Sequence, residues 1–384
     1  MEPSPSSLPD HIVVQILSYL SREDRSRAGR TCTDWQRCYR CPQLWYTSTF
    51  NFQQPHDGRC LPWLDQYAKH MRTVRIQLNQ HETENRANAC TALHKLCHAE
   101  ERRLTSLRIK FTGENPLFYA GQEFVDELKT LFGCRMESQK VQFRHIDLSG
   151  ISVAYDDSVF DVLSENNPQL ESLNILNGNL VCKISPECVQ RLVQRCRKLT
   201  DLRLFHCSMS DSVLSSLAEA EREPLKHLAI LCRREQKYIQ DLTSEAWSEL
   251  VKQCPQLRVV LGFDHTCPLR MVAVILKSEI PVVELRLETF TYIYDEVNLA
   301  ASFYSKTLEK VVLQTRNSPQ LGDSLINLGT RCQRLTSLLV YCVLEKTVVD
   351  KILALCPDMK EKGTYILKWE QEPEPWVVGV EEGD

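Results

Sequence analysis

The chain has 384 residues, of which 43% are hydrophobic and 25% are charged, and its formal net charge is −4 at pH 7. This composition is ordinary for a folded globular protein. The small negative charge argues against a nucleic-acid partner, because nucleic-acid-binding domains are usually strongly basic. No apolar run approaches the roughly 20 residues that span a bilayer, so we expect no membrane partner. The apolar stretch from Ile12 to Leu20 is interrupted by Gln15 and Ser18 and does not resemble a secretion signal.

Seventeen cysteines are present, an odd number in a long chain without a secretion signal. Disulfide scaffolds are typically short and secreted, so we expect reduced thiols and a cytoplasmic or nuclear location. Four of the cysteines lie three residues before the leucine or methionine that begins an apolar segment. They are Cys196, Cys254, Cys332 and Cys356. Recurrence at a fixed position predicts buried packing, since a free cysteine behaves as a small hydrophobe.

The first fifty residues have a helical pattern. Pro9 fits the first turn of a helix whose apolar positions run to Leu20. Ser21, with Asp24 three residues later, predicts the cap of a second helix, which we expect over residues 25–35. Leu44 and Trp45 close the segment. Three short helices in 38 residues are too small to bury this many apolar side chains, which predicts a partner or a packed neighbour.

From residue 71 onward the chain repeats the pattern Leu-x-x-Leu-x-Leu, or a close apolar substitute, every 25 to 39 residues. The ten repeats start at Met71, Leu104, Phe143, Leu170, Leu199, Leu225, Leu257, Val282, Leu308 and Leu335. The mean period, about 29 residues, lies in the range of leucine-rich repeats. In the seventh repeat we assign Val260 to the fourth, buried position of the pattern.

Each repeat combines a short alternating segment with a segment of helical periodicity, such as Cys188, Leu192 and Val193 before Leu199. The sequence therefore predicts an α/β fold: a three-helix domain over residues 1–50, then a solenoid over 51–363. Its parallel strands would line the concave face and its helices would lie outside. Residues 370–384 hold six acidic residues and no basic one, so we expect 364–384 to be an acidic, solvated tail.

The sequence offers little for catalysis or metal binding, and we expect no cofactor. Gly-x-Ser-x-Gly, Gly-x-Gly-x-x-Gly and Gly-x-x-x-x-Gly-Lys motifs are missing, which disfavours an independent enzyme. Cys38 and Cys41 have metal-ligand spacing, but no second pair follows at zinc-ribbon distance. Cys90, His94, Cys97 and His98 would share one helix face. That face has the residue types of a metal site, but simple packing of a repeat helix is the favoured interpretation.

The N-terminal segment resembles an F-box. The residues that carry the resemblance are Leu8-Pro9, Ile16-Leu17-Ser18-Tyr19-Leu20, Asp24-Arg25, Cys32-Thr33-Asp34-Trp35 and Leu44-Trp45. Thr31 and the polar run Arg25-Ser26-Arg27 depart from the usual pattern. An F-box followed by cysteine-containing leucine-rich repeats is similar to the F-box/leucine-rich-repeat family of ubiquitin-ligase substrate receptors.

This resemblance implies that the F-box docks on the Skp1 adaptor, and through it on cullin and RING subunits, while the repeats hold a protein substrate. Catalysis would then consist of proximity to a thioester formed elsewhere, and the chain itself would need no catalytic residue. The residues that we assign to Skp1 binding are Leu8, Pro9, Ile12, Ile16, Leu17 and Leu20, with Trp35, Leu44 and Trp45 bracing them. Some of these residues must instead form the small internal core of the domain, and the sequence does not sort them. The alternative is an interaction scaffold outside the ubiquitin pathway, with the first fifty residues serving only as a helical cap.

A substrate surface is also expected on the strands. Side chains alternate along a strand, so the seventh position of each repeat should face outward. Four successive repeats have an apolar residue there, and an apolar fifth position lies nearby. The predicted ledge consists of Leu176, Phe205, Leu231 and Phe263, with Leu261. A contiguous exposed apolar patch marks an interaction site. One alternative is a one-residue slip of the seventh repeat, where Val259, Val260 and Leu261 are all apolar. Another is that a loop or the C-terminal tail covers the ledge.

Overall fold

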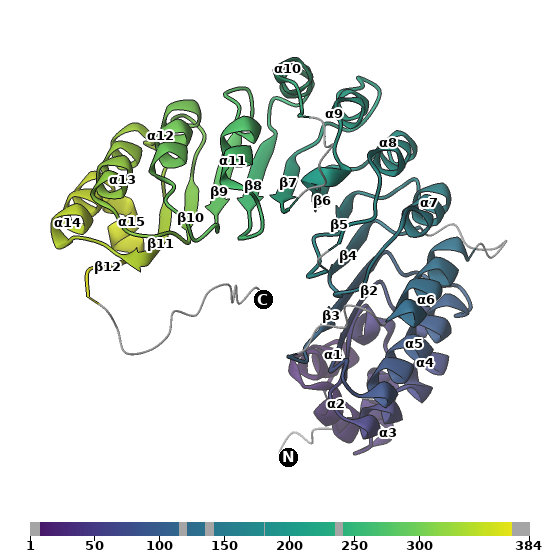
Figure 1. Cartoon of the computed structure of the whole chain (residues 1–384). Coiled ribbons are helices and arrows are strands. Elements are labelled where there is room, and N and C mark those ends of the chain that lie inside the picture. The colour runs from purple at the N-terminus through teal and green to yellow at the C-terminus, as the bar shows by residue number, and fades with distance from the viewer. Residues whose placement is uncertain (1–7, 115–120, 135–141, 180, 235–240, 371–384) are drawn as a thin grey trace. The chain divides into compact units, whose positions relative to one another are not determined.

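The computed structural model of the protein describes residues 8–114, 121–134, 142–179, 181–234 and 241–370. Strands alternate with helices, and the hydrogen-bonded order of the strands is their order in the chain, from β1 to β12 (Figure 1). The strands pair in parallel, for example Val74 with Leu107 and Leu285 with Val311. The predicted α/β fold, with short helices at the N-terminus followed by a solenoid of parallel strands and helices, is therefore confirmed.

The chain divides into two compact units, Met1–Ser172 with Asn177–Val181, and Leu173–Leu176 with Cys182–Asp384. The strands of the first unit are β1 Thr47–Phe52, β2 Thr73–Leu78, β3 Ser106–Phe111 and β4 His145–Gly150. Its helices are α1 Asp10–Tyr19, α2 Arg22–Ala28, α3 Thr33–Tyr39, α4 Pro62–Tyr67, α5 Thr83–Cys97, α6 Gln122–Gly133 and α7 Asp157–Asn166. Shorter 3-10 helices are η2 Pro42–Trp45, η3 Pro55–Cys60 and η4 Ala68–His70. In this unit α4 to α7 lie along one face of the strands (Figure 1).

The short strand β5 (Ser172–Asn174) stands at the division between the units. The strands of the second unit are β6 Asp201–Phe205, β7 His227–Cys232, β8 Arg258–Phe263, β9 Val282–Leu287, β10 Lys310–Leu313, β11 Ser337–Val343 and β12 Tyr365–Lys368. Its helices are α8 Pro186–Arg195, η5 His206–Ser208, α9 Asp211–Leu217, α10 Ser244–Gln253, α11 Leu269–Ile275, α12 Tyr294–Phe303, α13 Pro319–Arg331, α14 Lys346–Leu355 and α15 Pro357–Lys362.

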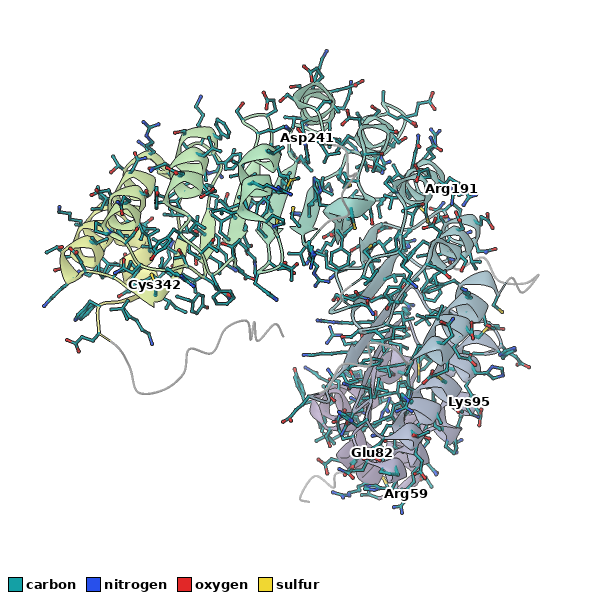
Figure 2. The ribbon with its side chains drawn as sticks, viewed as in Figure 1. Arg59, Glu82, Lys95, Arg191, Asp241 and Cys342 are labelled. Carbon is teal, nitrogen blue, oxygen red and sulfur yellow. The ribbon has the colours of Figure 1, made fainter. Side chains whose placement is uncertain are left out.

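Recurring polar residues explain where many of the helices begin. Each of four helices of the second unit starts after a serine or threonine whose side-chain oxygen accepts a backbone N–H bond three residues on. The four capping residues are Ser185, Ser210, Thr243 and Ser318. Such a bond satisfies a donor that the first turn of a helix leaves unpaired. Charged side chains such as Lys95 on α5 and Arg191 on α8 cover the helical layer (Figure 2).

The core lies between the strands and the helices. The repeat pattern predicts its members with one exception: Val259 and Leu261 of β8 are buried, whereas Val260 is only half-buried. The four cysteines at the fixed repeat position, Cys196, Cys254, Cys332 and Cys356, are buried, and every cysteine of the chain is a free thiol. Their predicted role in packing is confirmed. No helix among the described residues has both the length and the apolar character needed to cross a bilayer.

Two features differ from the sequence-based expectation. The helix expected over residues 25–35 is two helices, because α2 ends at Ala28 and α3 begins at Thr33. Ser21 caps α2 as predicted, accepting a bond from the backbone N–H of Asp24. The sheet also exceeds the ten predicted strands at both ends. It begins at Thr47 within the segment assigned to the F-box, and it ends at Lys368 within the segment assigned to the tail.

Candidate functional site

Helix α1 carries two apolar stripes. Val13 and Leu17, four residues apart, are buried and face α3 and η2. Ile12, Ile16 and Tyr19 follow the same spacing on the neighbouring face of the helix. Ile16 is 36% exposed and Tyr19 is 80% exposed, while Ile12 is half-buried. One stripe therefore builds the interior of the F-box, and the other is left largely uncovered by the described residues of this unit.

Three residues assigned to Skp1 binding belong instead to the interior. Leu17, Leu44 and Trp45 are all at most 5% exposed. The indole Nε1 of Trp45 donates a 3.1 Å hydrogen bond to the carbonyl oxygen of Tyr39. Some of the assigned residues were expected to form the internal core, and Leu44 and Trp45 to brace the surface. The structure places all three in the core, because α1 packs against η2 and α3. There they support the exposed stripe of α1 from below.

Arg25 of α2 links the end of α1 to η2 through three hydrogen bonds. Its Nε donates to the carbonyl oxygen of Leu17 at 3.0 Å, and Nη2 donates to that of Leu20 at 3.4 Å. Nη1 reaches the carbonyl oxygen of Leu44 at 2.7 Å. The first two carbonyls lie at the end of α1, where helices leave such groups unpaired and where a cation is favoured. The Asp-Arg of the F-box pattern thus supplies a structural cation.

The entry to α1 is exposed and is fixed by an ion pair. Leu8 and Pro9, just before the helix, are exposed, and Leu8 is 37% exposed. Asp10 accepts a 2.6 Å hydrogen bond from Nη2 of Arg37 on α3, and this bond lowers the pKa of the Asp10 carboxyl. Leu20 and Trp35 are half-buried. The apolar surface available to a partner is therefore Leu8, Pro9, Ile16 and Tyr19, flanked by Ile12, Leu20 and Trp35. We call these seven residues the α1 surface.

Tyr19 was not among the residues assigned to docking, although it is the most exposed large hydrophobic residue described. The signal for it was present in the sequence. Tyr19 lies seven residues after Ile12 and three after Ile16, which places the three on one helix face. Its neighbour Leu20, which was assigned, lies nearer the interior because it follows Val13 and Leu17 at the same spacing.

The predicted ledge on the strands does not exist as an exposed surface. Leu261 and Phe263 are core residues, at 1% and 0% exposure, because β8 is shifted by one residue from the predicted register. Phe205 does face outward, but it is only 4% exposed. The guanidinium of Arg233 lies over its ring, 4.5 Å from the centroid. Leu176 and Leu231 are half-buried. The prediction that these five side chains form one exposed apolar patch is therefore wrong, and no substrate surface is assigned to them.

The cysteine and histidine patterns do not form metal sites in the described part of the chain, where no three His, Cys, Asp or Glu side chains are grouped suitably for a metal. Cys38 is buried, with its thiol directed at the carbonyl oxygen of Asp10. On α5, Cys97 is buried while His94 and His98 are exposed with their rings 4.3 Å apart. The four residues Cys90, His94, Cys97 and His98 therefore do not converge on one point.

Comparisons with known proteins agree with this arrangement. The family model described as F-box-like matches residues 5–51, which contain α1 to α3 and η2. Human F-box/LRR-repeat protein 8 is 30% identical over 370 residues, covering 96% of this chain and 96% of the human protein. The chain belongs to the F-box/LRR-repeat protein family. A more distant member, mouse F-box/LRR-repeat protein 21, is 24% identical over 91% of this chain and 80% of its own length.

Local segments favour the same branch of the family. Residues 113–121, and Tyr365–Lys368 with Trp376 beyond, resemble F-box/leucine-rich-repeat protein 8 in particular. That likeness is confirmed by the match to the human protein and by a 29% identical mouse relative of the same name. Residues 115–120 and Trp376 lie outside the described residues. Among solved structures, the leucine-rich-repeat protein LegL7 from Legionella pneumophila is only distantly similar, with a TM-score of 0.39 and 14% identity over 82% of this chain and 98% of LegL7.

Proposed function

We propose that this protein is the substrate-recognition subunit of an SCF-type E3 ubiquitin ligase, acting in the cytoplasm or nucleus. In this proposal the α1 surface docks on Skp1, which links the chain to the cullin and RING subunits. The repeats then hold a protein substrate near the ubiquitin-conjugating enzyme. The chain contributes proximity, which raises the effective concentration of substrate lysines near the thioester, and supplies no catalytic group.

The observation that supports this proposal is the outward stripe of α1. A helix that covers one core needs one apolar face, and α1 has a second. Ile16 and Tyr19 are exposed in a domain whose interior is already filled by Leu17, Leu44 and Trp45. Exposed apolar clusters of this kind mark interaction sites, and aromatic anchors such as tyrosine are enriched among the residues that dominate binding energy.

The test is co-purification of Skp1 with the full chain and with two matched variants. The docking variant carries Ile16→Glu and Tyr19→Glu. The control variant carries Val274→Glu and Leu355→Glu, which also place two carboxylates on exposed apolar positions, at 45% and 43% exposure, but on α11 and the end of α14. Truncating a buried interface anchor costs about 2 kcal/mol or more, so the docking variant should lose at least about 30-fold in affinity.

The control variant should bind Skp1 as the unchanged chain does, and both variants should keep the circular dichroism of the folded protein. Equal binding by the docking variant would overturn the assignment of the α1 surface. If the unchanged chain fails to bind Skp1 at all, the interaction-scaffold alternative replaces the ligase proposal. Leu8→Ala with Pro9→Ala provides a second test at the entry to the helix, because both residues are exposed and their loss leaves the interior intact.

A further inference from the structure

Two cysteines from consecutive strand ends meet in the second unit. Cys182 lies in the segment after β5, and Cys207 lies in η5, directly after β6. Because β5 and β6 are neighbours in a parallel sheet, the segments that leave them emerge at the same edge. Ser208, the residue next to Cys207, has its Oγ 3.3 Å from the Sγ of Cys182. Both cysteines are only half-buried, so part of each residue is open to solvent.

The surroundings of Cys182 favour its thiolate. A hydrogen bond from the Cys207 thiol is the largest of the effects that lower the pKa of Cys182 to about 6, and together these effects outweigh the opposite effect of burial. The Ser208 hydroxyl stands between the Cys182 sulfur and the carbonyl oxygen of Ile184, which it reaches at 2.8 Å, and its proton can turn to either. Arg233 adds a positive charge nearby, partly balanced by Asp264 at 3.1 Å.

The chain contains a second pair of adjacent thiols, in which the pKa of one cysteine is raised instead of lowered. Cys97 on α5 and Cys134 after α6 also interact, with the Cys134 thiol 3.7 Å from the carbonyl oxygen of Cys97. There, burial raises the pKa of Cys97 to about 12. Cys97 is 1% exposed. Adjacency of two thiols is thus common to both pairs, but the surroundings lower the pKa of Cys182 and burial raises the pKa of Cys97. This contrast supplies a control within the same molecule.

We propose that Cys182 and Cys207 are a redox-active pair that a hydroperoxide converts reversibly to a disulfide. The Cys182 thiolate attacks an oxygen of hydrogen peroxide and takes it as a sulfenic acid, while the O–O bond breaks and hydroxide leaves. The Cys207 sulfur then attacks the sulfur of that sulfenic acid, forming the S–S bond and releasing the sulfenic oxygen as water. In total two thiols lose two electrons and two protons, and the peroxide becomes two waters.

The geometry suits a cross-link of this kind. Disulfides join residues whose Cα atoms are about 4.4–6.8 Å apart, and Cys182 is hydrogen-bonded to the Cys207 thiol and lies 3.3 Å from the hydroxyl of the adjacent Ser208. The bond would join the segments that follow β5 and β6, near Phe205 at the end of β6 and Arg233 just after β7, whose guanidinium lies over the Phe205 ring. Oxidation would therefore cross-link the edge at which β5 and β6 end. This inference stands independently of Skp1 docking.

The test uses the purified full chain, brief treatment with hydrogen peroxide, and alkylation of the remaining thiols before digestion and mass spectrometry. We expect a peptide linked through Cys182 and Cys207, with a mass about 2 Da below the sum of the two free peptides, and its loss on treatment with dithiothreitol. The variant Cys207→Ser should instead accumulate a sulfenic acid at Cys182, trapped by dimedone. The variant Cys134→Ser should leave the Cys182–Cys207 linkage unchanged.

A second measurement is the rate of alkylation by iodoacetamide at neutral pH, where Cys182 should react at least about tenfold faster than Cys97 because the thiolate is the nucleophile. The proposal would be overturned by a Cys97–Cys134 linkage that forms as readily as the Cys182–Cys207 linkage. It would also be overturned if Cys182 is alkylated no faster than Cys97, or if Cys207→Ser traps no sulfenic acid at Cys182.

Discussion

The indole of Trp45 stacks on the ring of Tyr67, with the centroids 3.8 Å apart and the ring planes at 3° to each other. Trp45 is the last residue of the F-box helices, and Tyr67 is the last residue of α4, the first solenoid helix. Tyr39 of α3 packs edge-on against both rings. The F-box and the first repeats therefore share one aromatic cluster and pack as a single body within the first unit.

This cluster predicts a large effect for Trp45→Ala. Removing a fully buried tryptophan costs about 3–5 kcal/mol of unfolding free energy, through lost burial and the cavity left behind. Urea denaturation of the full chain, followed by circular dichroism, should show the destabilisation. Tyr19→Ala is the matched aromatic control, because that side chain is 80% exposed and its loss should cost under about 1 kcal/mol. Similar denaturation midpoints for the two variants would contradict the prediction.

Arg25→Met should destabilise the F-box by at least about 2 kcal/mol, because it leaves the carbonyl groups of Leu17 and Leu44 without their charged donor. The control is Arg27→Met on the same helix. That side chain is 75% exposed, and its ion-pair partners among the described residues are Glu23 and Asp24, so its loss should cost under about 1 kcal/mol. Hydrogen exchange of the backbone amides in α1 measures the effect locally, with faster exchange expected for Arg25→Met alone.

Glu309 predicts a pH-dependent contribution to stability. It accepts two hydrogen bonds from Arg258, at 2.6 and 3.0 Å, and these bonds lower the pKa of the Glu309 carboxyl; Arg334 lies 3.1 Å away. A carboxyl whose pKa is lower in the folded state stabilises that state above its unfolded pKa, about 4.3, and the effect is lost as the pH falls through the folded pKa. Because Arg258 is 43% exposed, solvent limits the contribution to about 1 kcal/mol or less.

Glu309→Gln should therefore lower the melting temperature at pH 7, and the difference from the unchanged chain should shrink as the pH falls below about 4. The control is Glu361→Gln on α15, an exposed position with no ion pair among the described residues. A difference that stays constant between pH 7 and about pH 3.5 would show that the effect of Glu309→Gln is not electrostatic.

Gly150→Ala should disturb the pairing of β3 and β4. A Cβ atom on Gly150 would lie 2.5 Å from the carbonyl oxygen of Ile109 and 2.8 Å from the Cα of Lys110, both of them backbone atoms. The register between the two strands shifts at this point, so the backbones approach closely there. Overpacking of this kind costs about 1–3 kcal/mol. Gly133→Ala, which meets only a methyl group of Val162 at 3.2 Å, should change the unfolding free energy by under about 1 kcal/mol.

The sequence predicts most of the core because the leucine pattern reports burial directly. It fails at β8, where Val259, Val260 and Leu261 are all apolar. Three apolar residues in a row do not show which side chains face the core and which face outward. It also misses β1 and β12, since their buried residues, such as Phe50 and Leu367, do not follow the leucine spacing. These end strands are fixed by pairing with β2 and β11, which is a property of the assembled sheet.

The candidate site was predicted less completely than the fold. The F-box pattern identifies α1, but a single list of apolar residues does not separate its two stripes. That separation depends on where α3 and η2 pack, which places Leu17 inside and Tyr19 outside. The ledge failed at Phe205 for a similar reason. Its cover, Arg233, lies 28 residues later in the chain, and no local pattern links the two.

The first strand crosses the boundary at which an F-box would ordinarily be cut away. A chain that starts at residue 51 would lose Thr47 to Phe50 of β1 and, with them, the partners of Thr73 to Ile76 in β2. It would expose a new hydrogen-bonding edge and the pocket that Phe50 fills. Such a truncated protein would be prone to aggregate, and its failure to capture a substrate would say nothing about Skp1. Substitutions on the α1 surface, which leave the strand intact, are the sounder way to separate adaptor binding from substrate binding.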